Sequence, residues 1–152
     1  MQMLIGDVCN RNVVFATREM TVGEAASLMR RHHVGDVVVI DRADEQRMPI
    51  GILTDRDIVV EVVAPGLDPR TIRLGDLLSW GKLVTVEEKD TWSDTVRLMS
   101  EKGIRRVPVV NASGVLVGIV SIDDILPQLT KELAELAELS RRGRQREVET
   151  RK

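Results

Sequence analysis

The chain has 152 residues, of which 43% are hydrophobic and 30% charged, and its net charge is −2. This length suits one compact domain or two small units with a shared core, and it argues against a catalytic protein with a separate substrate domain. The slightly negative charge and the presence of only three aromatic residues argue against nucleic acid as a partner.

Membrane and export signals are absent from the sequence. No segment approaches the roughly 20 apolar residues that a membrane span needs, and the N-terminus lacks the basic and apolar regions of a signal peptide. The single cysteine, Cys9, can form no internal disulfide, which suits a reducing compartment. We therefore expect a soluble, cytoplasmic protein with no membrane partner.

The first half of the chain predicts five elements in order. A short apolar strand at 12–17 precedes a helix opened by Thr21, with Glu24 three residues on, as a capping box requires. A run of Val and Ile at 34–40 predicts a strand that is covered on both faces. The remaining elements are a short strand at 50–53 and a second helix from Thr54, which the Pro and Gly of the segment at 64–70 end.

The second half repeats this series. Residues 21–41 align with residues 91–111 at an offset of 70, and the phrase GILTDRDI at 51–58 returns as GIVSIDDI at 118–125. The predicted elements are a strand at 82–86, a helix opened by Thr91 with Asp94, strands at 104–110 and 116–120, and a helix from Ser121.

One such unit of about 60 residues buries too little surface to be stable alone. We therefore predict an α+β fold in which two β-α-β-β-α repeats pack sheet to sheet around a shared core, as a pseudo-two-fold pair with a cleft on each side. The predicted boundaries are a first repeat at 3–64, a linker at 65–73, a second repeat at 74–130, and a C-terminal helix with a basic tail at 131–152.

The repeated phrase has the chemistry of a nucleotide site. Thr54 and Ser121 stand at helix N-caps, where free backbone N–H groups and the helix dipole favour an anion. Asp57 and Asp124, three residues on, carry carboxylates that can accept both hydroxyls of a ribose. The same spacing is also an ordinary capping arrangement, so these residues could serve only as helix caps.

The ending G-I-x-(T/S)-x-x-D-(I/L) and the strand (V/I)-x-x-(V/L)-(P/V)-V-(V/I) both occur twice, in order and at matching spacing. This pattern resembles a tandem pair of cystathionine β-synthase (CBS) domains, or Bateman module, of the stand-alone bacterial type, over about residues 3–130. The resemblance implies a non-catalytic energy sensor that forms flat homodimers and acts on an unidentified effector protein. Its ligand would be AMP, ADP or ATP, with NAD and S-adenosylmethionine as further candidates, and it would need no other cofactor.

The resemblance also implies roles for individual residues. Asp57 and Asp124 match the family's ribose-binding aspartate, and Thr54 and Ser121 match its hydroxyl near the phosphate or the ribose. The residues that would line the base pockets are Val34 and Gly35 in one repeat, Ile104 and Arg105 in the other, and Val14 and Val84 from the leading strands.

The two copies differ in their arginines. The second repeat has Arg105 and Arg106 where family members carry phosphate-binding basic residues, whereas the first repeat has Arg56 inside its repeated phrase. Because the planar arginine fork suits phosphate, we expect two unequal clefts. The stronger phosphate site is predicted to combine Asp124 with Arg105 and Arg106, the alternative being that these arginines form a solvated loop pair.

Other reactive residues show no catalytic or metal pattern. His32 and His33 adjoin and so point about 100° apart on a helix, which prevents them from chelating one ion as an i, i+4 pair would. Cys9 has no partner histidine nearby in the sequence, and we expect no metal site and no enzyme activity. If the aspartates are only caps, the alternative function is a ligand-free structural or protein-interaction module.

The C-terminal segment predicts a further helix with Leu129, Leu133 and Leu136 on one side. Two heptads are short for an independent coiled coil, so we expect this stripe to pack on its own module or across a dimer partner. Pro127 should weaken or kink the helix. The basic end, from residue 140 on, is expected to be a solvated tail, or else an arm that docks on an acidic partner.

Overall fold

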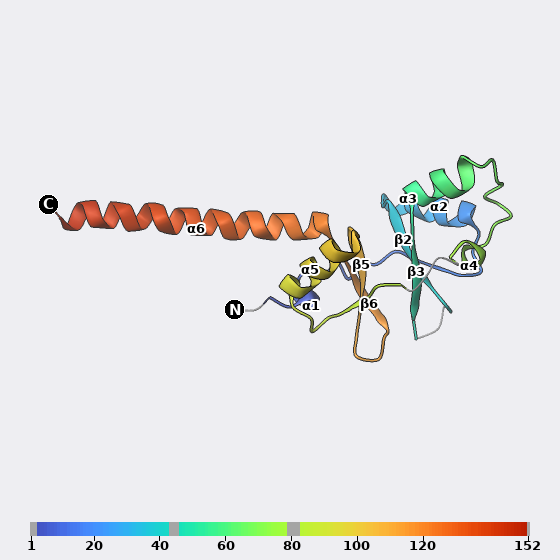
Figure 1. Ribbon diagram of the computed structural model, residues 1–152, viewed down its shortest axis with the longest axis horizontal. Coiled ribbons are helices and arrows are strands. Elements are labelled where there is room, and N and C mark those ends of the chain that lie inside the picture. The colour runs from blue at the N-terminus through green and yellow to red at the C-terminus, as the bar shows by residue number, and fades with distance from the viewer. Residues whose placement is uncertain (1–2, 43–45, 79–82, 152) are drawn as a thin grey trace.

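The computed structural model describes residues 3–42, 46–78 and 83–151. The first repeat comprises β1 (Phe15–Thr17), α2 (Val22–His32), β2 (Asp36–Ile40), β3 (Pro49–Thr54), α3 (Asp55–Ile58) and a π-helical segment, Val59–Val63. The second comprises β4 (Val86–Glu87), α5 (Trp92–Lys102), β5 (Arg106–Val110), β6 (Leu116–Ser121) and α6 (Ile122–Thr150). Short helices precede the repeats, namely α1 (Ile5–Val8) and α4 (Leu74–Leu77). The predicted β-α-β-β-α order is confirmed in both halves (Figure 1).

Each repeat forms a three-stranded sheet with the same topology. The order is β1-β2-β3 in one sheet and β4-β5-β6 in the other, and the first two strands of each are parallel while the last pair is antiparallel. The central strands are buried along their Val and Ile runs, as predicted. The leading strands are shorter than predicted, because only the end of each apolar run pairs with the central strand.

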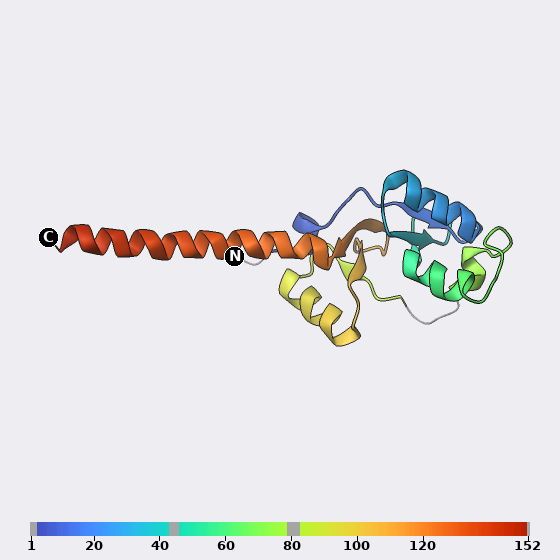
Figure 2. The same cartoon turned by 90° about the horizontal axis from the view of Figure 1, so that it is seen from above.

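The core has three parts. One cluster lies within the first repeat around Val37 and Leu53, and a second lies within the second repeat around Val107 and Val120. A third cluster joins Val38 and Ile40 of β2 to Leu116 of β6. This third cluster is the shared core that two small units were predicted to need, and it holds the two sheets against each other (Figures 1 and 2).

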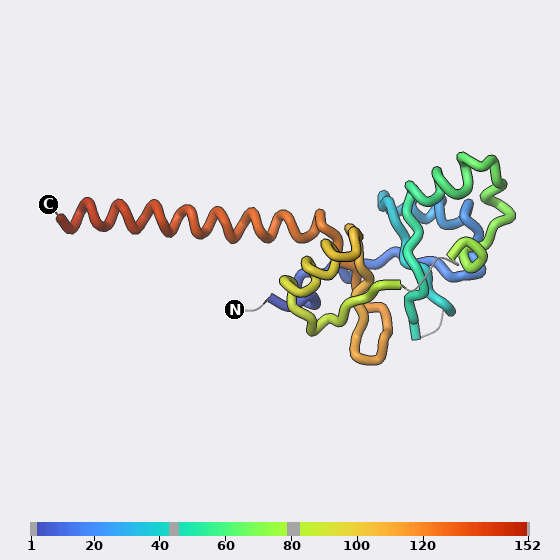
Figure 3. Tube along the Cα trace, in the orientation of Figure 1, coloured from blue at the N-terminus to red at the C-terminus, as the bar shows by residue number. Residues whose placement is uncertain are grey.

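The short leading helices cross over between the repeats. The N–H of Ile5 in α1 donates to the carbonyl of Asp90 in the second repeat, at 2.9 Å. In the pseudo-symmetric position, the N–H of Leu74 in α4 donates to the carbonyl of Met20 in the first repeat, at 2.8 Å. Ile5 and Leu74 are both fully buried in these exchanged positions. The trace in Figure 3 shows the N-terminal segment beside the second repeat. The predicted boundaries of the repeats and of the linker at 65–73 stay predictions.

The crossing segments explain why a glycine recurs in the repeated phrase. A Cβ on Gly51 of β3 would lie 2.7 Å from Cδ2 of Leu78, in the segment after α4. A Cβ on Gly118 of β6 would lie 2.7 Å from Sγ of Cys9, in the segment after α1. Real Cβ atoms do not approach other atoms this closely, so glycine is needed wherever a crossing segment passes over the strand.

The last helix differs most between the repeats. The first repeat ends its helix at Val63, before Pro65 and a Gly66 with a φ of +78°. In the second repeat α6 continues as one helix for 29 residues, through Pro127, and extends away from the module (Figures 1 and 2). Pro127, which was expected to weaken or kink the helix, does not end it, and the predicted C-terminal helix is part of the second repeat's own last helix.

The leucine stripe does not pack on its own module, so packing across a dimer partner, the other expected arrangement, stays a prediction. The side chains of Leu133 and Leu136 are 65% and 62% exposed, and Leu126 and Leu129 are also exposed. Only the first turns of α6 reach the core, where Ile125 is buried. The physical reason is that α6 extends away from the module, so its later turns have no part of the module beside them (Figure 1).

Candidate functional site

The repeated phrase forms the same helix cap in both repeats. In the first, the N–H of Asp57 donates to Oγ1 of Thr54 at 3.1 Å, and the N–H of Thr54 donates to Oδ2 of Asp57 at 2.9 Å. In the second, the N–H of Asp124 donates to Oγ of Ser121 at 3.2 Å, and the N–H of Ser121 donates to Oδ2 of Asp124 at 2.9 Å. Both aspartates therefore act as caps, which was the alternative interpretation of this spacing.

Capping leaves part of each carboxylate available. The bonds within each cap use Oδ2, and no residue in the described ranges donates a hydrogen bond to Oδ1 of Asp57 or Asp124. A cap and a ribose contact are therefore compatible at the same side chain. Of the caps that open the first helix of each repeat, Thr21 and Glu24 form a complete capping box, whereas Asp94 accepts from the hydroxyl of Thr91 rather than from its backbone N–H.

Two cavities lie between the repeats. The first cleft has a volume of about 470 Å³ and is lined by Ile50, Gly51, Ile52, Thr54, Asp55, Arg56, Leu78, Leu83, Val84, Ile104, Arg105 and Arg106. The second cleft has a volume of about 370 Å³ and is lined by Asn10, Asn12, Val13, Val14, His33, Val34, Gly35, Asp36, Arg106, Ile119, Ser121, Asp123 and Asp124. Each cleft thus joins the N-terminal end of one repeat's last helix to residues that precede the central strand of the other.

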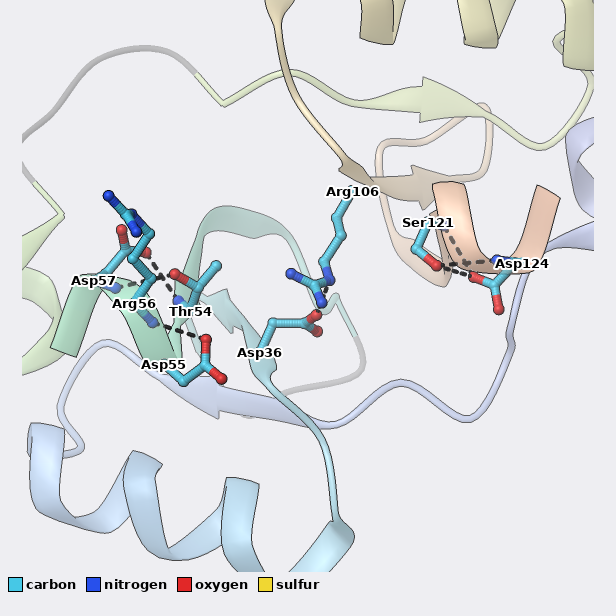
Figure 4. A network of polar contacts seen from close by, with 8 residues as sticks. All are labelled: Asp36, Thr54, Asp55, Arg56, Asp57, Arg106, Ser121 and Asp124. Atoms are coloured by element: carbon cyan, nitrogen blue, oxygen red, sulfur yellow. Dashed lines mark hydrogen bonds and ion pairs between the residues drawn. The ribbon is translucent and has the colours of Figure 1, made fainter. Parts of the chain in front are cut away.

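This exchange corrects the predicted grouping of site residues. Arg105 lines the first cleft with Thr54 and Arg56, whereas Asp124 lines the second cleft with Val34 and its neighbours. Asp124 was expected in one site with Arg105 and Arg106, and of these two arginines only Arg106 lines the cleft of Asp124. The crossed arrangement separates Asp124 from Arg105, since each helix start faces the opposite repeat. Asp57 lines neither cleft within the described residues, and its carboxylate lies at the cap (Figure 4).

The two clefts have opposite charge. Among the described residues, the first is lined by three arginines, Arg56, Arg105 and Arg106, and one carboxylate, Asp55. The described lining of the second has three carboxylates, from Asp36, Asp123 and Asp124, and one arginine, Arg106. An anion is therefore favoured in the first cleft and disfavoured in the second.

An ion pair joins the repeats between the clefts. Nε of Arg106 lies 2.5 Å from Oδ2 of Asp36, and their side chains are 33% and 18% exposed (Figure 4). Burial raises the pKa of the Asp36 carboxyl above its ordinary value, and attraction to Arg106 only partly opposes this rise. The two residues occupy equivalent positions in the repeats, so the pair spans the pseudo-two-fold axis.

Sequence reasoning missed Asp36 as a site residue, together with Asn10 and Asn12 of the N-terminal segment. A signal for Asp36 existed, because positions 36 and 106 align at the repeat offset and carry opposite charges. Residues at equivalent positions near a two-fold axis face each other, so opposite charges there indicate an ion pair. No comparable signal existed for the asparagines, because no sequence pattern in the N-terminal segment indicates that it packs against the second repeat.

Comparison with known proteins gives the family. A family model described as CBS domain matches residues 5–64 and 74–131. The chain belongs to the CBS domain family. The double match and the two sheets together show a tandem CBS module, as the repeated motifs predicted.

Several CBS proteins are similar to this chain. An uncharacterised protein of Methanopyrus kandleri is 42% identical over 122 residues, which are 80% of this chain and only 60% of that protein. Hypoxic response protein 1 of Mycobacterium tuberculosis is 36% identical and is covered over 82% of its length, with 81% of this chain. The structure of a CBS domain protein of Pyrobaculum aerophilum in complex with AMP is 27% identical, with a TM-score of 0.72 over 85% of this chain and 99% of that chain.

Two structural features of the described residues bear on other functions. They contain no group of three or more His, Cys, Asp and Glu side chains that could hold a metal ion. No helix within the described ranges is long and apolar enough to cross a membrane.

Proposed function

We propose that this CBS pair is a non-catalytic regulatory module that binds an adenosine nucleotide in its first cleft. The carrying observation is that Arg56, Arg105 and Arg106 all line this cleft, beside the N-cap of α3. Arginine favours phosphate because its planar guanidinium forms paired, charge-assisted hydrogen bonds. The ligand class is supported by the relative from Pyrobaculum aerophilum, whose structure contains AMP.

The rest of the first cleft suits the base and the sugar. Its walls are apolar where Ile52, Val84 and Ile104 meet, and its volume of about 470 Å³ lies within the roughly 300–1,000 Å³ of small-molecule sites. A flat, weakly polar adenine fits such a wall, while the arginines hold the phosphate end. The second cleft, with its three carboxylates, is proposed to bind a nucleoside or nucleotide more weakly, through Ser121 and Asp124.

Nucleotide binding would act through the arrangement of the repeats. The first cleft takes side chains from both repeats, so a ligand there favours one relative arrangement over others. Arg106 would transmit the effect of the bound ligand to the second cleft, because Arg106 lines both clefts and pairs with Asp36. We propose that a homodimer presents this change to an effector protein in the cytoplasm.

A calorimetric titration tests the nucleotide proposal. AMP is titrated into the wild-type protein and into Arg105→Ala, with adenosine as a second ligand that lacks the phosphate. Loss of a charge-assisted contact of about 1.5–3 kcal/mol predicts an AMP affinity roughly 10- to 100-fold lower in the variant. The affinity for adenosine is expected to be the same in both proteins, because the guanidinium meets only the phosphate.

Arg30→Ala is the matched control. It removes an exposed arginine from the last turn of α2, away from both clefts, and should leave AMP binding unchanged. Equal AMP affinity in wild type and Arg105→Ala would reject the first cleft as the phosphate site. Absence of binding by AMP, ATP, NAD and S-adenosylmethionine to the wild type would favour the ligand-free interaction module, in which Asp57 and Asp124 are caps only.

A further inference from the structure

Arg106 is the one arginine among the described residues that lines both clefts. Its side chain leaves the first residue of β5 and reaches Asp36, the first residue of β2, between the helix caps of the two repeats (Figure 4). Nε of Arg106 lies 2.5 Å from Oδ2 of Asp36. The other two arginines of the first cleft, Arg56 and Arg105, have no ion-pair partner in the part of the chain that the structure describes.

Asp36 holds the Arg106 guanidinium on the side of the second cleft. Asp36 is among the described residues that line the second cleft, and it is not among those that line the first. Both side chains of the pair are partly buried, so the attraction between their charges is screened less than it is for a surface pair. One of the three arginine charges of the first cleft is therefore already matched by a carboxylate of the protein itself.

A phosphate in the first cleft would need the same guanidinium. Phosphate and carboxylate both bind arginine through charge-assisted hydrogen bonds to its planar fork, and Asp36 already engages Nε. Burial, and then repulsion by Asp55 and Asp124, raises the pKa of the Asp36 carboxyl against the attraction of Arg106. Negative charge around Asp36 is thus already in excess, which disfavours an arrangement in which Arg106 bridges Asp36 and a phosphate.

We propose that Asp36 is a specificity-determining residue, which competes with the phosphate of the ligand for Arg106 and thereby lowers the affinity of the first cleft for nucleotides. This inference rests on the proposed function, because it requires a phosphate in the first cleft. A nucleotide draws Arg106 away from Asp36, whereas a nucleoside leaves the ion pair intact. The pair therefore reduces the preference of the first cleft for nucleotides over nucleosides.

The competition also fixes the sign of the coupling between the clefts. When a phosphate holds Arg106 in the first cleft, Asp36, Asp123 and Asp124 line the second cleft without their arginine. A second phosphate is then repelled more strongly, and by linkage the effect is reciprocal. Each chain should therefore bind one AMP, and a second at least about tenfold more weakly.

Calorimetric titration of AMP and of adenosine into Asp36→Asn tests the competition. Because asparagine has no charge, it releases Arg106 more easily, so the affinity for AMP should rise at least about fivefold. The affinity for adenosine should change less than about twofold. Asp36→Ala, which also removes the hydrogen-bond acceptor, should increase the affinity for AMP at least as much.

Asp41→Asn is the matched control. It removes a carboxylate from another arginine pair, in which Nη1 of Arg18 lies 2.8 Å from Oδ1 of Asp41. Neither residue is among those that line the two clefts. The affinities for AMP and adenosine should both equal those of the wild type. Circular dichroism checks that each variant is folded at the temperature of the titration.

An Arg106→Gln background separates competition from simple repulsion. If Asp36 only repels the phosphate from a distance, Asp36→Asn should improve AMP binding equally with and without Arg106. If Asp36 competes for Arg106, the gain in this background should fall below about twofold, because there is no guanidinium to release. Arg56 and Arg105 still line the first cleft of the Arg106→Gln protein, so its AMP affinity should remain measurable. An undiminished gain would overturn the competition.

The sign of the change in Asp36→Asn distinguishes the possible roles of the ion pair. A lower affinity for AMP would overturn the competition and show that Asp36 positions Arg106 for the phosphate. An unchanged affinity would also overturn it, since Arg106 would then not meet the phosphate. Two equal AMP sites in the wild type would overturn the coupling. Absence of AMP binding to the wild type and to every variant would instead reject the proposed function, and the competition with it.

Discussion

Replacing Gly118 by alanine tests the crossing of the N-terminal segment over the second repeat. The added Cβ would lie 2.7 Å from Sγ of Cys9 and 3.2 Å from the carbonyl oxygen of Asn10. The segment cannot easily withdraw, because Asn10 and Ile119 exchange two backbone hydrogen bonds of 2.8 and 2.9 Å. Overpacking of this kind destabilises by about 1–3 kcal/mol. Loss of a flexible glycine from a strand offsets about 0.5–1 kcal/mol of that, which leaves a net loss of about 1–2 kcal/mol.

Urea unfolding of Gly118→Ala and of Cys9→Ala, alone and combined, measures this contact. Because Cys9→Ala removes the closest atom, the double variant should lose at least about 0.5 kcal/mol less than the sum of the two single variants. The control is Gly143→Ala in α6, where a Cβ meets nothing within 4 Å and alanine should stabilise the helix by up to about 1 kcal/mol.

Two results would refute this reasoning. If Gly118→Ala were as stable as the wild type, the segment after α1 would not lie over β6 in solution. If the two substitutions were strictly additive, the clash would not involve Cys9. A net loss of about 1–2 kcal/mol corresponds to a fall in Tm of a few degrees for a chain of this size, which thermal unfolding can resolve.

Two further predictions concern the cap and the ion pair. Ser121→Ala should lower the free energy of unfolding by about 1 kcal/mol in urea titrations, because it removes the acceptor for the N–H of Asp124, and an unchanged midpoint would contradict the cap. Burial holds the pKa of Asp36 above its unfolded value, so the folded state binds more protons between the two values and loses stability as pH rises through that window. Urea unfolding from acid to neutral pH should therefore show Asp36→Asn gaining stability relative to wild type as pH rises, and a constant difference would contradict it.

The sequence predicted what local patterns determine. The repeat, the order of its elements and the buried Val and Ile strands follow from periodicity and turn residues, and the structure confirms them. The caps at Thr54 and Ser121 were also readable, because a cap depends on residues three positions apart. The repeat also predicted the shared core, because one unit alone is too small to bury enough apolar surface.

The remaining features depend on contacts between distant segments. The exchange of α1 and α4 between the repeats is not visible in the residues of either helix, and it moved Asn10 into the second cleft. Arg105 and Asp124 were predicted to share one site, whereas the pseudo-two-fold arrangement places them in opposite clefts. The exposure of Leu133 could not be predicted either, because its stripe is equally suited to packing on the module or on another helix.

The chemistry of the two clefts follows from where the repeats differ rather than from where they agree. The shared phrase supplies the same cap twice, so it cannot distinguish one cleft from the other. Charge distinguishes them, because Arg56 and Arg105 line the first cleft. In the second cleft the position equivalent to Arg56 is Asp123, and the position equivalent to Arg105 is Gly35. In a duplicated module, positions that have diverged in charge near the axis are therefore the residues that assign separate roles to otherwise equivalent sites.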